Sequence, residues 1–197
     1  MNPAKGELEE SVRRRFARLA TDPAGEKDFA VGPRSALSLG YDPGEIGLLP
    51  AVVAESFAGV GCPFLLGDID PGLAVVDIGC GSGVDSLLAA GRVGPRGAVL
   101  GLDMTGEMVG NARSGAESLN LAHARFIVGH ADRMEIETAF ADIALSNGVI
   151  NLCVDKARVL AEIARIVKPG GRLFLADIFL EAESAAEGLS EIGQWSD

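Results

Sequence analysis

Several features that would narrow the function are scarce in this sequence of 197 residues. Its three cysteines, Cys62, Cys80 and Cys153, are too few and too scattered for a disulfide framework or a tetrahedral zinc site, so we expect reduced thiols and no metal. No apolar run reaches the roughly 18 residues of a membrane span, and the charged start "MNPAKGELEE" is unlike a signal peptide. These absences predict a soluble, cytoplasmic protein that does not enter membranes.

Positive charge is scarce as well. The formal net charge of −11 would repel a phosphate backbone, so we expect no nucleic-acid partner. The one basic cluster, Arg13 to Arg15 with Arg18, directly follows three glutamates. We interpret it as part of a solvated, mixed-charge helix and not as an arm that binds nucleic acid.

The first seventy residues and the rest of the chain have different patterns. Apolar residues at helical spacing predict an amphipathic helix over 7–20 that packs as a lid or flank. Clusters of Gly, Pro and Asp over 21–64 predict short helices and loops, with one helix beginning between Asp42 and Gly44 because Asp42 can cap it. We therefore expect a lid segment over 1–70.

From residue 73 onward, predicted strands alternate with predicted helices, which favours parallel pairing through right-handed crossovers. The expected fold is α/β, with a doubly wound and mostly parallel sheet. We place the main domain at 71–180 and a helical segment at 181–197. The predicted strands are 73–79, 98–103, 124–130, 142–147 and 172–180, and the predicted helices are 84–93, 106–121 and 155–167.

Three glycines follow the first predicted strand on alternate positions, within "VVDIGCGSGVDSLLAA". Gly79, Gly81 and Gly83 would allow unusual torsions and let a ligand touch the backbone. The helix that begins near Gly83 adds free N–H groups, which favours a ligand carrying a carboxylate or phosphate. The dinucleotide pattern G-x-G-x-x-G fails because its third glycine would be Val84 or Ser86. We therefore expect a cofactor other than a nicotinamide or flavin dinucleotide.

Acidic residues mark three consecutive strands. Asp77 lies two residues ahead of the first glycine, and Asp103 ends the next strand, where a carboxylate can accept hydrogen bonds from two ribose hydroxyls. Asp132 follows the third strand and is placed to accept a hydrogen bond from an adenine amine, while Ala131 offers a backbone N–H. Three acids at three strand ends suit an adenosine that carries no phosphate.

With these residues in place, the sequence resembles the class I methyltransferases that use S-adenosylmethionine. Five segments match in order over roughly 71–179: "VVDIGCGSG", "GLDMT", "GHAD", "LSNGVINL" and "IVKPGGRL". The resemblance implies a Rossmann-like sheet, with five strands in the order 3-2-1-4-5 and the last two strands of the family missing. It implies these cofactor contacts: Asp77, Gly79, Cys80, Gly81, Ser82 and Gly83 around the methionine part, Asp103 on the ribose, Met104, Ala131 and Asp132 around the adenine, and Asn147.

A narrower resemblance is to the arsenite methyltransferases and their cysteine-poor relatives, carried by "SFAGVGCPF", "LDMTGEM" and "SNGVINL". That chemistry needs soft thiolates to hold trivalent arsenic. The family's thiol after strand four falls at Gly148, the chain ends at "QWSD" where a further thiol would follow, and the N-terminal paired cysteines are absent. We therefore expect a different small-molecule acceptor, with arsenic methylation through Cys62 and Cys153 as the alternative.

No obvious general base stands out, so the weak catalytic candidates are Asn147, Cys153, Cys62 and His130. Cys80 is interpreted as a small filler within the cofactor loop. Bases in nucleic acid are usually methylated by enzymes with two prolines and an aromatic residue after the fourth strand, and here Gly148 and Val149 follow Asn147. A second alternative is a non-catalytic protein that binds the cofactor and acts through a partner.

The last predicted strand, 172–180, would lie at an edge of the sheet, and an apolar edge invites pairing. Three explanations compete: a homodimer partner covers this edge, the terminal segment folds over it, or the chain is a shortened form of a longer protein. We favour the third, because the helical pattern in 181–197 is interrupted after Trp195.

Overall fold

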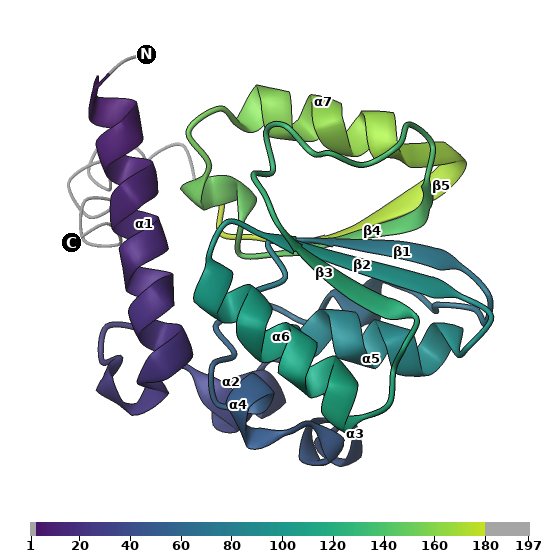
Figure 1. Ribbon diagram of the computed structural model, residues 1–197, viewed down its shortest axis with the longest axis horizontal. Coiled ribbons are helices and arrows are strands. Elements are labelled where there is room, and N and C mark those ends of the chain that lie inside the picture. Colours follow the sequence, from purple (N-terminus) through teal and green to yellow (C-terminus); the bar gives the residue numbers. More distant parts are fainter. Residues whose placement is uncertain (1–2, 180–197) are drawn as a thin grey trace.

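The computed structural model describes residues 3–179. Its centre is a five-stranded sheet in the order β3-β2-β1-β4-β5, with every neighbouring pair parallel. This is the doubly wound order expected from the resemblance (Figure 1). The strands are β1 Ala74–Ile78, β2 Ala98–Asp103, β3 Ala124–Val128, β4 Ala141–Asn147 and β5 Val167–Ala176.

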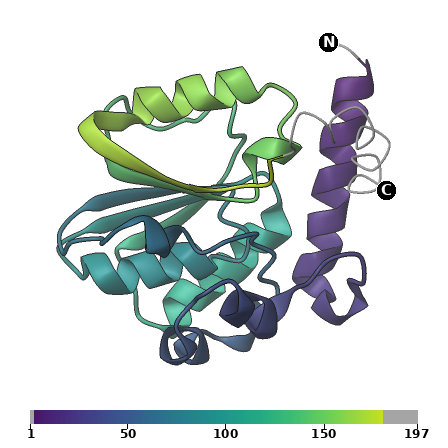
Figure 2. The ribbon, with the colours of Figure 1, turned by 180° about the vertical axis from the view of Figure 1, so that it is seen from behind.

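Helices cover both faces of the sheet, as Figures 1 and 2 show from opposite sides. Helices α5 (Val84–Val93) and α6 (Gly106–Ser118) lie on one face, and α7 (Lys156–Ile166) lies on the other. Alternate residues of each strand supply the two cores, so Val75 packs with α5 and α6 while Val76 packs with α7. Burial on both faces explains why the strands read as continuous apolar runs in the sequence.

The N-terminal segment contains one long helix and several short ones, as its punctuated sequence predicts. Helix α1 stands at the side of the molecule and packs against α6 (Figure 1). The short helices lie below α5 and α6 in the same view. The elements are α1 Pro3–Thr21, η1 Pro23–Gly25, α2 Gly32–Ser38, α3 Pro43–Leu48, α4 Ala51–Ala54 and η2 Pro63–Leu66, and a further short turn, η3 Ile150–Leu152, follows β4.

The start of α3 confirms the capping interpretation. Asp42 Oδ1 accepts a hydrogen bond of 2.9 Å from the Glu45 N–H, and Pro43 occupies the first helical position. We expect Asp42→Ala to lower the free energy of unfolding by about 1 kcal/mol, measured by urea denaturation. Asp42→Asn keeps a capping oxygen and serves as the control. An equal loss in both variants would show that the carboxylate acts through something other than the cap.

Strand β5 begins earlier than the sequence pattern indicated. The segment "KPGG" at 168–171, which separates the predicted helix 155–167 from the predicted strand 172–180, lies inside β5, and the strand ends at Ala176. Gly170 has a φ of +81°, and a Cβ at Gly171 would lie 2.9 Å from the Asp142 carbonyl oxygen. These glycines create a bulge, seen as a register shift opposite Ala141 and Ile143, so the chain bends without leaving the sheet.

β5 pairs only with β4 in the described part of the chain, which confirms that it is an edge strand there. The predicted helical segment 181–197 lies outside the described residues. No helix within 3–179 combines the length and the apolar character needed to cross a bilayer.

Candidate functional site

The carboxyl ends of β1, β2 and β4 open onto a cavity of about 370 Å³. In a doubly wound sheet this edge, beside the point where the strand order reverses, is where ligands bind. The cavity is lined by the glycine loop after β1, the ends of β2 and β4, the loop after β3 and part of α1. Every residue expected to contact a cofactor lines it except Gly83, so the crevice required by the sequence interpretation exists.

The three glycines of the loop all have positive φ angles, +70° at Gly79, +51° at Gly81 and +92° at Gly83, but they lack side chains for different reasons. A Cβ at Gly81 would meet nothing within 4 Å and would point into open space. A Cβ at Gly79 would clash with Val149, and one at Gly83 would lie 2.8 Å from the Ala112 Cβ of α6. Close approach of protein groups, and not of a ligand, therefore explains two of the three glycines.

Hydrogen bonds hold the glycine loop against β2 and α4. The N–H groups of Gly79 and Cys80 both donate to the Leu102 carbonyl, at 2.7 and 3.0 Å. The Ser82 hydroxyl donates to the Val53 carbonyl at 2.8 Å, deep in the interior. The buried Cys80 thiol packs against β2, as expected of a small filler. The loop is thus fixed in shape before any ligand arrives.

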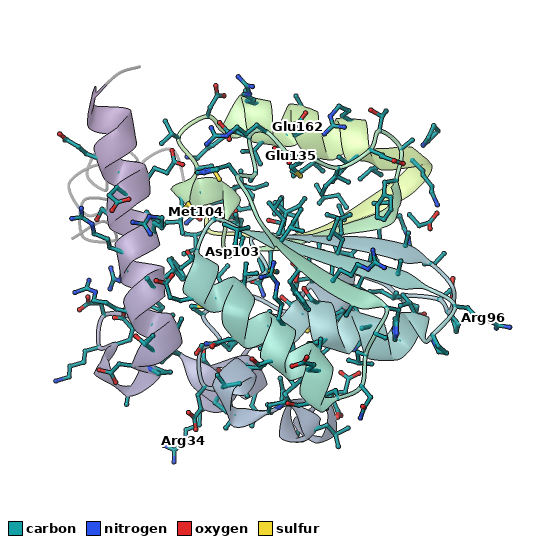
Figure 3. All side chains as sticks on the ribbon, viewed as in Figure 1. Arg34, Arg96, Asp103, Met104, Glu135 and Glu162 are labelled. Atoms are coloured by element: carbon teal, nitrogen blue, oxygen red, sulfur yellow. The ribbon has the colours of Figure 1, made fainter. Side chains whose placement is uncertain are left out.

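Asp103, at the end of β2, faces the cavity, and two backbone N–H groups fix its carboxylate. Its Oδ2 accepts a 2.9 Å hydrogen bond from the Gly81 N–H, and its Oδ1 accepts a 2.8 Å bond from the Thr105 N–H. Each oxygen keeps a further lone pair for a ligand hydroxyl. Burial raises the pKa of this carboxyl above its usual value. Figure 3 shows Asp103 and the neighbouring Met104 between α1 and the strand ends, and both residues line the cavity.

Two more carboxylates lie in the same wall. Asp77 is 2% exposed and accepts a 2.6 Å hydrogen bond from the Ser86 hydroxyl. Burial and the nearby charge of Asp85 raise the pKa of Asp77 to about 8. Asp85 was not identified from the sequence, where it resembles an ordinary acid in the first turn of a helix. It is 6% exposed, and burial raises its pKa to about 6.

Asn147, a weak catalytic and cofactor candidate, lines the cavity at the end of β4. Its side-chain amide forms hydrogen bonds with other groups of the protein. Its oxygen accepts hydrogen bonds from the N–H groups of Val60 (2.8 Å) and Gly61 (3.2 Å). Its nitrogen donates to Asp85 Oδ2 at 3.0 Å. The side chain therefore ties the N-terminal segment to β4 and α5.

The loop after β3 brings His130, Ala131 and Asp132 to the opposite side of the cavity. His130 Nδ1 lies 2.6 Å from Glu9 Oε1 of α1, so this ring pins the helix against the loop. The Asp132 side chain is a third exposed and lies 3.6 Å from Arg133. Glu9 was not predicted, because nothing in the sequence links it to a histidine more than a hundred positions away.

The structure does not bring Cys62 and Cys153 together. Cys62 is buried in the core on the α5 and α6 face, whereas Cys153 packs with the core on the α7 face. Cys153 lines the cavity, but burial raises its pKa to about 11, so it is a protonated thiol at neutral pH. Burial also raises the pKa of Cys62. The structure therefore gives no support to the predicted alternative of a two-thiol site. No His, Cys, Asp and Glu cluster suited to a metal occurs within 3–179.

The donor set of the cavity fits a nucleoside with a positively charged tail. The carboxylates of Asp85 and Asp103 would repel a pyrophosphate, and the open face of Gly81 admits a ligand close to the backbone. A carboxylate at the end of β2 matches a pair of ribose hydroxyls. S-adenosylmethionine has each of these parts: an unphosphorylated ribose, a sulfonium and an ammonium group.

Comparison with known proteins agrees with this assignment. The arsenite methyltransferase of Halobacterium salinarum is 32% identical over 188 residues, covering 87% of this chain and 47% of that protein. The enzyme of the same name from Aquipseudomonas alcaligenes is 32% identical over 187 residues, covering 91% of this chain and 53% of that protein. The chain thus spans about half the length of the curated relatives it matches.

Among solved structures, the arsenic(III) S-adenosylmethionine methyltransferase of Chlamydomonas reinhardtii superposes with a TM-score of 0.60 at 32% identity. The match covers 84% of this chain and 56% of that one. A family model described as a methyltransferase domain matches residues 69–196. The chain belongs to the methyltransferase domain family, as a class I S-adenosylmethionine-dependent member related to the arsenite methyltransferases.

Proposed function

We propose that this chain binds S-adenosylmethionine in the cavity at the strand ends and transfers its methyl group to a small molecule. The observation that carries the proposal is Asp103, a half-buried carboxylate fixed by two backbone N–H groups and facing the cavity beside the open Gly81. Asp103 would hold the ribose, Met104 and Ala131 the adenine, Asp132 the adenine amine, and Asp77 with the glycine loop the methionine part. The bound cofactor supplies a methyl group activated by its sulfonium.

The protein's contribution to transfer is alignment and exclusion of water. A displacement at a sulfonium gains most when the nucleophile, the methyl group and the sulfur are aligned in a dry site. Phe57, Ala58 and Val149 give part of the cavity an apolar wall. An apolar wall favours a small organic acceptor over arsenite, which needs thiolates.

Cofactor identity is tested by thermal stabilisation. A ligand at a hundred times its Kd stabilises the folded state by about 2.7 kcal/mol, which raises the unfolding midpoint of a chain this size by roughly 5 to 10 °C. We expect that shift with S-adenosylmethionine and with S-adenosylhomocysteine. NAD at the same concentration is the control and leaves the midpoint unchanged. A shift with NAD alone would overturn the assignment.

Arsenite methylation is the second candidate function, because relatives at 32% identity bear that name. The protein is incubated with methyl-labelled donor, a thiol and trivalent arsenic, and in parallel with a metabolite extract. Label in an organic product supports the small-molecule proposal, and label in arsenic supports the second candidate. If the donor binds and neither acceptor is labelled, the result favours the remaining alternative, a non-catalytic protein that binds the cofactor and acts through a partner.

A further proposal concerns the assembly. In this proposal a homodimer covers the open edge of β5. Separately, residues 1–70 act as the lid of the domain at 71–180. The apolar side chain of Leu173 on this strand is 37% exposed, which supports pairing there. Sedimentation of the wild type and of a Leu173→Lys variant tests the proposal, since the charge would weaken a dimer.

A further inference from the structure

Asp85 lies in the first turn of α5, but its side chain does not face solvent. The carboxylate lines the cavity and is 6% exposed. Its Oδ1 accepts a 2.6 Å hydrogen bond from the Tyr41 hydroxyl, and its Oδ2 accepts a 3.0 Å bond from the Asn147 amide. Tyr41 is itself buried, at 4% exposure, and receives a 3.0 Å bond from Asn147. The carboxylate is therefore held at a fixed place in the wall.

The charge of Asp85 has no cationic neighbour in the described part of the chain. Both of its partners are neutral, and Arg92, which attracts it from a distance, forms its ion pair with Glu45 at 2.9 Å. With a pKa of about 6, the carboxyl is largely ionised at neutral pH. A buried charge without a counterion is costly, so a cation in the cavity would be strongly favoured. The cavity is adjacent to this carboxylate and open to a ligand.

The sheet order fixes which part of a ligand reaches Asp85. Strand β1 lies between β2 and β4, so Asp103 at the end of β2 and Asn147 at the end of β4 lie on opposite sides of the glycine loop. Asp85 is bonded to Asn147 and so belongs to the β4 side. A nucleoside whose ribose sits on Asp103 and whose adenine sits on the Asp132 side, after β3, would therefore extend its 5′ substituent across β1 toward Asp85.

We propose that Asp85, held by Tyr41 and Asn147, binds the ammonium group of the methyl donor's amino-acid tail and so positions the tail across the glycine loop. The inference rests on the proposed function, because it takes the ribose to lie on Asp103. The inference assigns the binding of the tail's ammonium group to Asp85, a residue outside the glycine motif. The Asp77 carboxyl, bonded to Ser86 beneath the loop, is then a second and more deeply buried acid behind it.

The test compares two ligands that differ in the tail. S-adenosylhomocysteine carries the ammonium group, whereas 5′-methylthioadenosine has the same nucleoside and sulfur without it. Binding of both is measured by calorimetry to the full chain and to Asp85→Asn. We expect S-adenosylhomocysteine to bind about 30-fold more weakly or worse to the variant, and 5′-methylthioadenosine to change by less than about twofold. Structural damage would weaken both ligands and cancel in their ratio.

Asp103→Asn is the matched control, because it changes a carboxylate that the shared ribose contacts. It should weaken both ligands by similar factors. Tyr41→Phe keeps the charge of Asp85 and removes one hydrogen bond, so it should weaken S-adenosylhomocysteine by about three- to tenfold and spare 5′-methylthioadenosine. This variant also serves if Asp85→Asn does not fold.

Two patterns overturn the inference. If Asp85→Asn weakens both ligands equally, the residue shapes the cavity and does not bind the ammonium group. If it changes neither, the tail lies elsewhere. Binding of both ligands to the wild type keeps the proposed function intact in either case, whereas failure of the wild type to bind either ligand rejects the proposed function itself.

Discussion

Gly83→Ala will lower the free energy of unfolding by about 2 to 4 kcal/mol. The position has a φ of +92°, which an alanine adopts at a cost of about 1 kcal/mol or more. The new Cβ would lie 2.8 Å from the Ala112 Cβ and 3.2 Å from its Cα, and overpacking of this kind costs about 1 to 3 kcal/mol. Because backbone of α6 is involved, side-chain rotation alone cannot relieve the contact. Urea denaturation followed by circular dichroism measures the loss.

Gly91→Ala is the matched control for Gly83→Ala. Gly91 lies inside α5, and a Cβ there would meet nothing within 4 Å. A helix interior favours alanine over glycine by roughly 0.5 to 1 kcal/mol, so this variant should be more stable than the wild type. Similar losses in both variants would contradict the packing explanation of the glycine motif.

The stability of the folded protein will fall as pH rises from about 5 to about 8, through Asp77. Its pKa is about 8 when folded and 3.8 as the ordinary value, so the folded state holds a proton that the unfolded state releases. Protons bound in excess by the folded state make the free energy of unfolding decrease with pH. The stabilisation is fully present below pH 3.8 and is lost as pH rises through the folded pKa.

Comparison with Asp77→Asn isolates this effect from other titrating groups. The asparagine is neutral at every pH and can still accept the Ser86 hydrogen bond. The free energy of unfolding of the wild type, minus that of the variant, should fall by roughly 2 kcal/mol or more between about pH 5 and about pH 8. Urea denaturation at both pH values gives the difference. A constant difference would mean that Asp77 titrates in the folded state as it does in the unfolded chain.

The strands and helices of the sheet domain follow from local patterns in the sequence, whereas the order of the strands was implied by the family resemblance. Buried parallel strands appear in the sequence as apolar runs, and the helices between them have apolar residues at helical spacing. Helix α5, for example, occupies its predicted range 84–93. Strand β5 differs because two glycines that usually mark a turn instead form a bulge within a strand. That choice depends on whether the neighbouring strand accepts the bend, which a local pattern does not contain.

The site was predictable where its residues are adjacent in sequence and unpredictable where they meet through the fold. The glycine loop and Asp103 follow from their places at strand ends. Asp85 gains its meaning from Tyr41 and Asn147, which are 44 and 62 positions away. Likewise, the side chain that excludes a Cβ at Gly79 comes from Val149, after β4. Contacts of this range depend on how the layers pack.

The bonds of Asn147 and Asp85 make the first seventy residues an integral wall of the cavity and not a detachable module. A chain shortened to begin at residue 71 would lose the Val60 and Gly61 N–H groups and the Tyr41 hydroxyl. Asn147 Oδ1 and Asp85 Oδ1, which accept these hydrogen bonds, would then have lost their donors, and water would enter to hydrate them. Any experiment on the isolated sheet would therefore report on a wetter and differently shaped pocket.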